Sequence, residues 1–175
     1  RDRSVSRGLG DVYKRQRYTL GVLALANHGR LEDLCIGGKS VGAKIAAHLE
    51  SAPEQQQDKG SCIVVMATDL PLCARQLERV VKRASVGLAR LGSYIGHGSG
   101  EVFLGFSTTN RVPHESARAV LPCTVLHEGR IDAVFRAMGE ATEEAVLRAM
   151  LCADTVTGFD GSTKYTIRNF VSQIY

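Results

Sequence analysis

The chain has 175 residues, of which 44% are hydrophobic, and this is enough for one sizeable hydrophobic core. It has no apolar run that fits a membrane span, and no apolar segment follows its basic start, so neither a transmembrane helix nor a signal peptide is predicted. The net charge of +4 is a poor indicator of nucleic-acid binding, because residues 1–16 alone hold five basic and two acidic residues (5 − 2 = +3).

Residues 1–16 show no sustained hydrophobic periodicity. We interpret them as a non-native leader, such as translated adapter sequence, or as a disordered one, without a function of its own. A genuine basic arm is the alternative, and a nucleic-acid-binding module would depend on it. One domain is expected over residues 17–175.

Two strands are predicted early in this domain, one from Tyr18 to Ala26 and one from Asp33 to Ile36. The tripeptide Gly38-Lys39-Ser40 resembles the end of a phosphate-binding loop. However, Asp33 stands where the Walker pattern requires its first glycine, so no nucleotide site is predicted.

The junction between Gly60 and Ser61 is the most informative position of the chain. A polar linker without periodicity covers residues 51–59, and a β-branched run from Ser61 to Asp69 is typical of a buried central strand. Cleavage before Ser61 would create an α-amine, which titrates near ~7.7–8.0 and so provides a base beside a hydroxyl nucleophile. Taken alone, the pattern also fits an ordinary loop-to-strand junction.

The remaining elements follow from apolar spacing. A helix is predicted between Pro71 and Gly92, and a longer one from Arg130 to Thr157, with its glutamates on the solvated side. Strands are predicted over residues 102–108 and from Ala119 to Leu126.

Three polar residues lie next to predicted strands. Asn27 follows the first strand, and Ser99 and Glu101 precede the strand at 102–108. Because Ser99 and Glu101 are two residues apart, an extended backbone points both side chains to one face. Separately, each residue also fits a turn or a solvated strand end, and His28 and His97 are interpreted as turn or surface residues.

Taken in order, residues 23–30, 60–72 and 92–110 resemble the family of DmpA-type L-aminopeptidase/D-Ala-esterase-amidases and β-peptidyl aminopeptidases. The resemblance covers roughly residues 18–165. It implies an α/β fold, a four-layer α-β-β-α sandwich of the self-processing N-terminal-nucleophile type. In this family one chain is cut at a Gly-Ser bond, so that residues 17–60 would end the α piece and residues 61–175 would form the β piece.

The resemblance also implies roles for individual residues. Ser61 corresponds to the nucleophile, and Gly60–Ser61 to the cleaved bond. Ser99 and Glu101 correspond to residues that assist proton transfer, which fits a carboxylate that orients a hydroxyl and an amine. Asn27 corresponds to an amide donor to the oxyanion, a contribution of ~3–4 kcal/mol.

The implied function is a serine aminopeptidase/amidase that releases N-terminal residues from small peptides, amides or esters through an acyl-Ser61 intermediate. A related self-cleaving enzyme, the ornithine/glutamate N-acetyltransferase, begins its β piece with Thr, so Ser61 argues against it. A non-catalytic structural domain with an intact Gly60–Ser61 bond is the other alternative.

The family carries a long segment before the matched region, with further groups of the active site. We therefore expect the activity, and an oligomer of α/β units, of the complete protein rather than of this fragment by itself. Five cysteines without a C-x-x-C pair fit reduced core residues of a cytoplasmic protein (Cys35, Cys62, Cys73, Cys123 and Cys152). No zinc spacing occurs, and neither a metal nor a cofactor is predicted.

Overall fold

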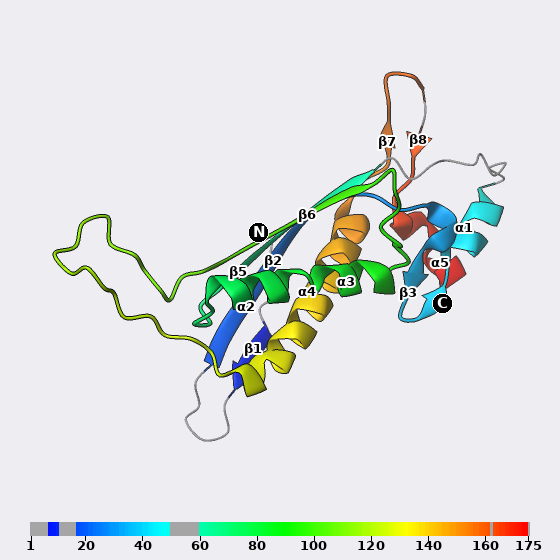
Figure 1. The fold of residues 1–175 in the computed structure, drawn as a ribbon. Helices are drawn as coiled ribbons and strands as arrows, with labels where there is room; N and C mark the ends of the chain where they lie inside the picture. Colours follow the sequence, from blue (N-terminus) through cyan, green and yellow to red (C-terminus); the bar gives the residue numbers. More distant parts are fainter. Residues whose placement is uncertain (1–6, 11–16, 50–59, 162, 175) are drawn as a thin grey trace.

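A computed structural model describes residues 7–10, 17–49, 60–161 and 163–174. Its main layer is a four-stranded sheet in the order β1-β2-β5-β6 (Figure 1). The strands are β1 (Arg7–Gly10), β2 (Arg17–Asn27), β5 (Ser61–Thr68) and β6 (Gly100–Ser107). β2 runs antiparallel to β1 and β5, whereas β5 and β6 are parallel. The parallel pair is joined by a helical crossover, as parallel strands require.

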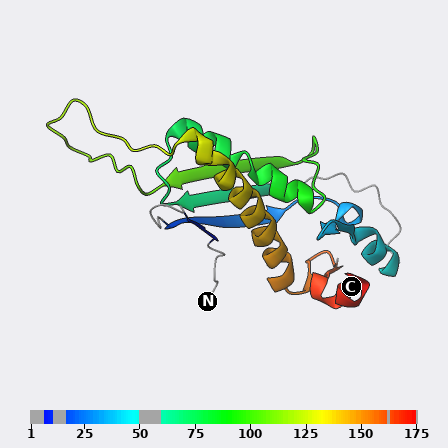
Figure 2. The ribbon, with the colours of Figure 1, turned by 90° about the horizontal axis from the view of Figure 1, so that it is seen from below.

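Three helices cover one face of the sheet, as the two ribbon views show (Figures 1 and 2). They are α2 (Ala74–Val81), α3 (Ala84–Arg90) and α4 (Ile131–Cys152). Alternate side chains of β5 point toward them, so that Cys62, Val64 and Met66 are fully buried. These residues form the main hydrophobic core together with apolar positions of the helices, such as Val80, Leu88, Val134 and Met138.

The opposite face of the sheet is apolar but exposed. Its side chains form rows across three strands, because the pairing aligns Leu25 with Ile63 and Val102, and Leu23 with Val65 and Leu104. Leu25 is 71% exposed and Leu104 54%. We call this surface the open face. The described residues thus build one helical layer and one sheet layer of the four expected, and both faces of β5 are apolar, as a covered strand requires.

Smaller elements pack beyond the sheet. The hairpin β3 (Cys35–Ile36) and β4 (Lys39–Ser40) precedes α1 (Gly42–His48), and η1 (Leu31–Asp33) lies before it. A second core joins Ile45 of α1 to Ile167 and Phe170. Near the C-terminus lie β7 (Val156–Thr157), β8 (Thr163–Lys164), η3 (Ile167–Phe170) and α5 (Val171–Ile174).

Several predicted elements need correction. The first helix is divided into α2 and α3 at Lys82 and Arg83, where the Arg83 amide bonds to the carbonyl of Val80 in a tight turn. The long helix ends at Cys152 rather than at Thr157, because the chain becomes extended at Ala153, before the β-branched residues of β7. The predicted strand from Asp33 to Ile36 contains only the two residues of β3.

The predicted strand from Ala119 to Leu126 is wrong. This segment belongs to a long excursion between β6 and α4, in which Val120 is 81% exposed (Figure 1). Pro122 lacks an N–H for strand pairing. Leu126 packs against the main core, whereas Val120 and Val125 remain exposed.

The leader, residues 1–16, was predicted to be non-native or disordered, and part of it is instead structured. Residues 7–10 of it form β1, which pairs with residues 17–20 of β2. Backbone pairing at a sheet edge depends on main-chain hydrogen bonds and needs no hydrophobic periodicity, so the pattern could not predict it. The rest of the leader, residues 1–6 and 11–16, and the linker at residues 51–59 lie outside the described residues.

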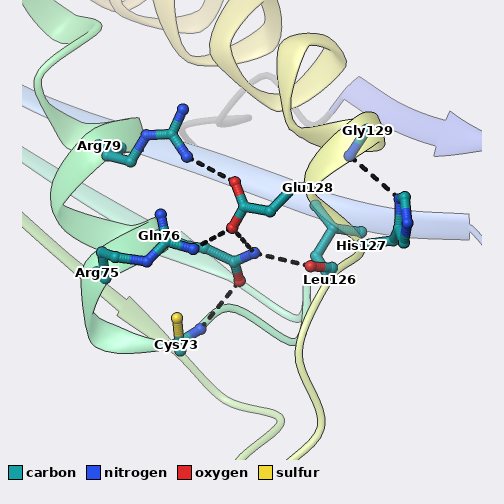
Figure 3. Close-up of polar contacts among 8 residues, drawn as sticks. All are labelled: Cys73, Arg75, Gln76, Arg79, Leu126, His127, Glu128 and Gly129. Atoms are coloured by element: carbon teal, nitrogen blue, oxygen red, sulfur yellow. Dashed lines mark hydrogen bonds and ion pairs between the residues drawn. The ribbon is translucent and has the colours of Figure 1, made fainter.

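The excursion returns to the core through a polar cluster on α2 (Figure 3). Glu128 of η2 (Glu128–Arg130) accepts hydrogen bonds from Arg75, Gln76 and Arg79, the last at 2.6 Å. Gln76 is buried and also donates to the Leu126 carbonyl at 2.7 Å. The hydrogen bond from Gln76, followed by that from Arg75, lowers the pKa of Glu128 to about 2. The cluster fastens the end of the excursion to α2.

All five cysteines are free thiols, but only Cys62 is fully buried. Cys123 and Cys152 are exposed, because the first lies in the excursion and the second is the last residue of α4. Most cysteines are therefore not core residues, contrary to the prediction. None of the helices in the described part of the chain has the length and apolar character that crossing a bilayer requires.

Candidate active site

The candidate site lies at the end of the sheet where β5 begins. Ser61 is the first residue of β5, and it pairs with Asn27, the last residue of β2. On its other side Ser61 pairs with Gly100, the first residue of β6. Ser99 and Glu101 flank Gly100 in the chain, so all four predicted positions lie at one end of three neighbouring strands.

Ser61 and Asn27 extend toward the open face. They occupy the same register row as Gly100, next to the apolar row of Leu25, Ile63 and Val102. Both residues are exposed. The sequence places them 34 positions apart (61 − 27), and the antiparallel pairing of β2 with β5 brings them opposite one another.

Ser99 and Glu101 form a pair of their own. The Ser99 hydroxyl donates to Oε1 of Glu101 at 2.5 Å, as their spacing along an extended backbone allows. Glu101 is opposite Cys62 in the parallel register. Burial, and after it the negative charge of Glu101, raises the pKa of the Cys62 thiol. The Glu101 carboxylate therefore lies on the side of Cys62, under the helices.

The structure thus divides the predicted residues between two faces of the sheet. Ser61 and Asn27 lie on the open face, whereas the Ser99–Glu101 pair lies on the helical side of the same strand ends. Because Ser61 is the first residue of β5, the Gly60–Ser61 peptide is the part of β5 that lies between these two faces.

Gly60 is held closely between neighbouring strands. A Cβ at this position would overlap the carbonyl oxygen of Asn27 and lie 2.7 Å from Cα of His28. The Gly60 carbonyl accepts a hydrogen bond from the Gly100 amide at 3.4 Å. The φ of Gly60 is not positive, so glycine is required here by the close approach of Asn27 and not by a left-handed backbone.

The histidines near the site differ in environment. Nδ1 of His28 is buried, and none of the described residues offers it a hydrogen-bond partner. His97 is exposed. Across residues 7–10, 17–49, 60–161 and 163–174, no three His, Cys, Asp or Glu side chains are grouped so as to hold a metal ion.

One polar group at the site was not predicted, namely the Gly100 backbone amide that binds the Gly60 carbonyl. Every residue except proline carries such an amide, so no residue type marks it. Only the register of β5 against β6 identifies it.

Comparisons to known proteins identify the family of this chain. The sequence profile of Peptidase family S58 matches residues 4–164. The chain belongs to peptidase family S58. The family predicted from the ordered motifs is thereby confirmed. The match begins inside the predicted leader, which had been expected to have no counterpart in the family.

A curated relative is the β-peptidyl aminopeptidase BapA of Sphingosinicella xenopeptidilytica, which is 38% identical over an alignment of 162 residues. The match covers 86% of this chain and 40% of that protein. The structure of the L-aminopeptidase D-Ala-esterase/amidase from Ochrobactrum anthropi matches 96% of this chain and 47% of its own, with a TM-score of 0.80 and 32% identity. The PH0078 protein from Pyrococcus horikoshii OT3 gives a TM-score of 0.82 at 38% identity, over 98% of this chain and 45% of its own.

These likenesses confirm the predicted fold class. The Ochrobactrum enzyme is described as a prototype for the serine aminopeptidases and as a variant of the Ntn hydrolase fold. This chain shares that α/β fold and spans less than half the length of each of these three proteins.

Proposed function

We propose that this chain is the nucleophile-bearing part of a serine aminopeptidase/amidase that activates itself by cleavage of the Gly60–Ser61 bond. The observation that carries the proposal is the position of Ser61, the first residue of a central strand, between Asn27 and Gly100. Membership of a peptidase family supports it.

In the proposed reaction the Ser61 hydroxyl attacks the carbonyl carbon of a substrate amide or ester. The free α-amine of Ser61, or the Ser99–Glu101 pair, accepts the hydroxyl proton. The Asn27 amide donates to the oxyanion from the open face. Cleavage would make Ser61 the N-terminus of a chain. Its free α-amine could then rotate at the end of β5 toward the Ser99–Glu101 pair. The substrate C–N or C–O bond then breaks, and the departing amine or alcohol takes up the proton. Water finally hydrolyses the acyl-Ser61 ester, which releases the acyl group as a carboxylic acid and restores the Ser61 hydroxyl.

For substrates we propose small peptides, amides or esters with a free N-terminal amine. The relatives support this class, since one is a β-peptidyl aminopeptidase and another an L-aminopeptidase and D-Ala-esterase/amidase. An acetyltransferase is disfavoured because Ser61, not Thr, begins β5 and the relatives are peptidases.

The partner that we propose for the open face is a further segment of the complete protein, the α piece. Exposed Leu25 lies in the row next to Ser61, and exposed Leu23 and Leu104 continue the apolar surface in the following row. Sheets with two apolar faces are normally covered on both. A cytoplasmic location and an oligomer of α/β units are also part of the proposal.

The test is the fate of the Gly60–Ser61 bond in the complete protein. Mass spectrometry of the wild type should find two pieces, one beginning with Ser61, and an alanine p-nitroanilide should be hydrolysed. Ser61→Ala should remain uncut and inactive because it lacks the attacking oxygen. Ser116→Ala, in the exposed excursion, is the matched control and should be cut normally. An uncut, inactive wild type would favour the structural domain instead.

A further inference from the structure

We propose that the backbone N–H of Gly100 is an oxyanion donor for the self-cleavage at Gly60–Ser61; this inference rests on the proposed function. The N–H of Gly100 already donates to the carbonyl oxygen of Gly60, the carbonyl of the bond to be cut, at 3.4 Å. It therefore touches the atom on which negative charge would develop.

Both covalent steps of self-cleavage place charge on that oxygen. In the first, a bond forms between Oγ of Ser61 and the carbonyl carbon of Gly60, the C–N bond breaks, and the hydroxyl proton passes to the departing nitrogen. The products are an ester and a free α-amine. In the second, water adds to the ester, and the C–O bond breaks to give the Gly60 carboxyl and the Ser61 hydroxyl.

The length of the hydrogen bond suits this role. At 3.4 Å the N–H···O contact is longer than the usual ~2.9–3.0 Å, so the ground state gains little from it. As the carbonyl carbon becomes tetrahedral, the oxygen acquires charge and the contact can shorten. An interaction that strengthens only in the transition state accelerates the reaction, whereas one that is already strong in the ground state does not.

The surroundings hold this donor in place. Gly100 is the first residue of β6 and is held by the parallel register with Ser61. Gly60 fits so closely against Asn27 that it cannot carry a side chain, and this contact fixes its carbonyl from the β2 side. The Asn27 and Gly100 positions therefore flank Ser61 from the two neighbouring strands.

Two substitutions at Gly100 distinguish the effect of losing the backbone N–H from the effect of adding a side chain. A Cβ at Gly100 would meet no atom within 4 Å, so Gly100→Ala keeps the donor without crowding. Gly100→Pro removes it, and proline is tolerated at the first residue of a strand. Glycolic acid in place of Gly100 gives a backbone ester, which replaces only the N–H by oxygen and controls for misfolding of the proline variant.

The rate of Gly60–Ser61 cleavage is measured by mass spectrometry in the complete protein, with thermal unfolding in parallel. Gly100→Ala keeps the N–H, so we expect it to be cut at least ~10-fold faster than the ester variant. The ester and proline variants should be cut ~100-fold or more slowly, as for loss of one oxyanion donor. An ester variant that is cut at the wild-type rate would overturn the inference, and so would a Gly100→Ala variant that is slowed as much as the ester.

The outcomes also separate this inference from the function on which it rests. A wild-type protein that is never cut would sink both proposals. A wild type that is cut, with Ser61→Ala uncut and the ester variant cut normally, would leave the proposed function in place and remove only the role of Gly100.

Discussion

Glu128 illustrates how a single carboxylate can fix a long irregular segment. Three side chains of one face of α2 donate to it, and two of them, Arg75 and Arg79, carry positive charge (Figure 3). Arg79 also lies over the ring of Phe135 in α4, 5.3 Å from its centroid, so the cluster connects η2, α2 and α4.

Glu128→Gln should destabilise the fold at neutral pH, and this effect should disappear in acid. The folded pKa of Glu128 is lowered to about 2 from 4.5, so its contribution is complete above the unfolded pKa and is lost as the pH falls from about 4.5 toward 2. Urea unfolding of wild type and variant between pH 7 and pH 2 measures the difference.

Glu78→Gln provides the comparison. The pKa of Glu78 is also lowered, first by its hydrogen bond from Lys82, but this exposed pair links two residues of one helical stretch. Its loss should therefore have a smaller effect than loss of Glu128. A Glu128→Gln effect that stays constant down to pH 2 would contradict the proposed ionic anchor.

At the scale of elements, the crossing of α3 and α4 depends on small residues. A Cβ at Gly87 would lie 2.5 Å from the carbonyl oxygen of Gly139 and 2.8 Å from Cβ of Thr142. Thr142 is completely buried, and its hydroxyl donates to the Met138 carbonyl at 2.9 Å within α4. The two helices thus approach until backbone meets backbone.

Gly87→Ala and Gly139→Ala should have opposite effects, although both are glycine-to-alanine changes in a helix. The first should cost ~1–3 kcal/mol because the new methyl overpacks the crossing. At Gly139 the nearest atom to a new Cβ is 3.6 Å away, so the helix should gain up to ~1 kcal/mol from propensity alone. Denaturant unfolding of both variants measures this. Equal effects would show that the helices do not pack this closely.

At the scale of the whole molecule, the open face is the surface that we propose to pack against the α piece of the complete protein. In the strand register, the apolar rows of the open face begin next to the row that contains Ser61. Any layer that covers the open face would therefore also border the candidate site. In this arrangement Ser61, the proposed nucleophile, would lie at the edge of an interface, where water is partly excluded.

Leu25→Lys in the complete protein tests whether this face is covered. Leu25 is 71% exposed in this chain, and burial under a second layer would make its loss cost ~1.5–3 kcal/mol. Val112→Lys, at an 82% exposed position of the excursion, is the control and should change stability by less than ~0.5 kcal/mol. If Leu25→Lys were as neutral as its control in denaturant unfolding, the face would be open to water in the complete protein.

The sequence by itself determined the elements whose information is local. Alternation and β-branching predicted β2, β5 and β6, the apolar stripe predicted most of α4, and the order of three motifs identified the family. The excursion at residues 108–127 shows the limit of such patterns: the largely apolar segment from Ala119 to Leu126 was predicted to be a strand, but a strand needs a neighbour with free hydrogen-bonding groups.

Tertiary structure decided everything that depends on register. The pairing of Asn27 with Ser61, and of Ser61 with Gly100, connects residues that are far apart in the chain. The same register assigns Glu101 to the side of Cys62 and brings the Gly100 amide to the Gly60 carbonyl. Strand register is fixed by long-range packing of the buried face, and a shift by one residue would reverse every side chain, so the sequence could propose candidate site residues but could not assign them to faces.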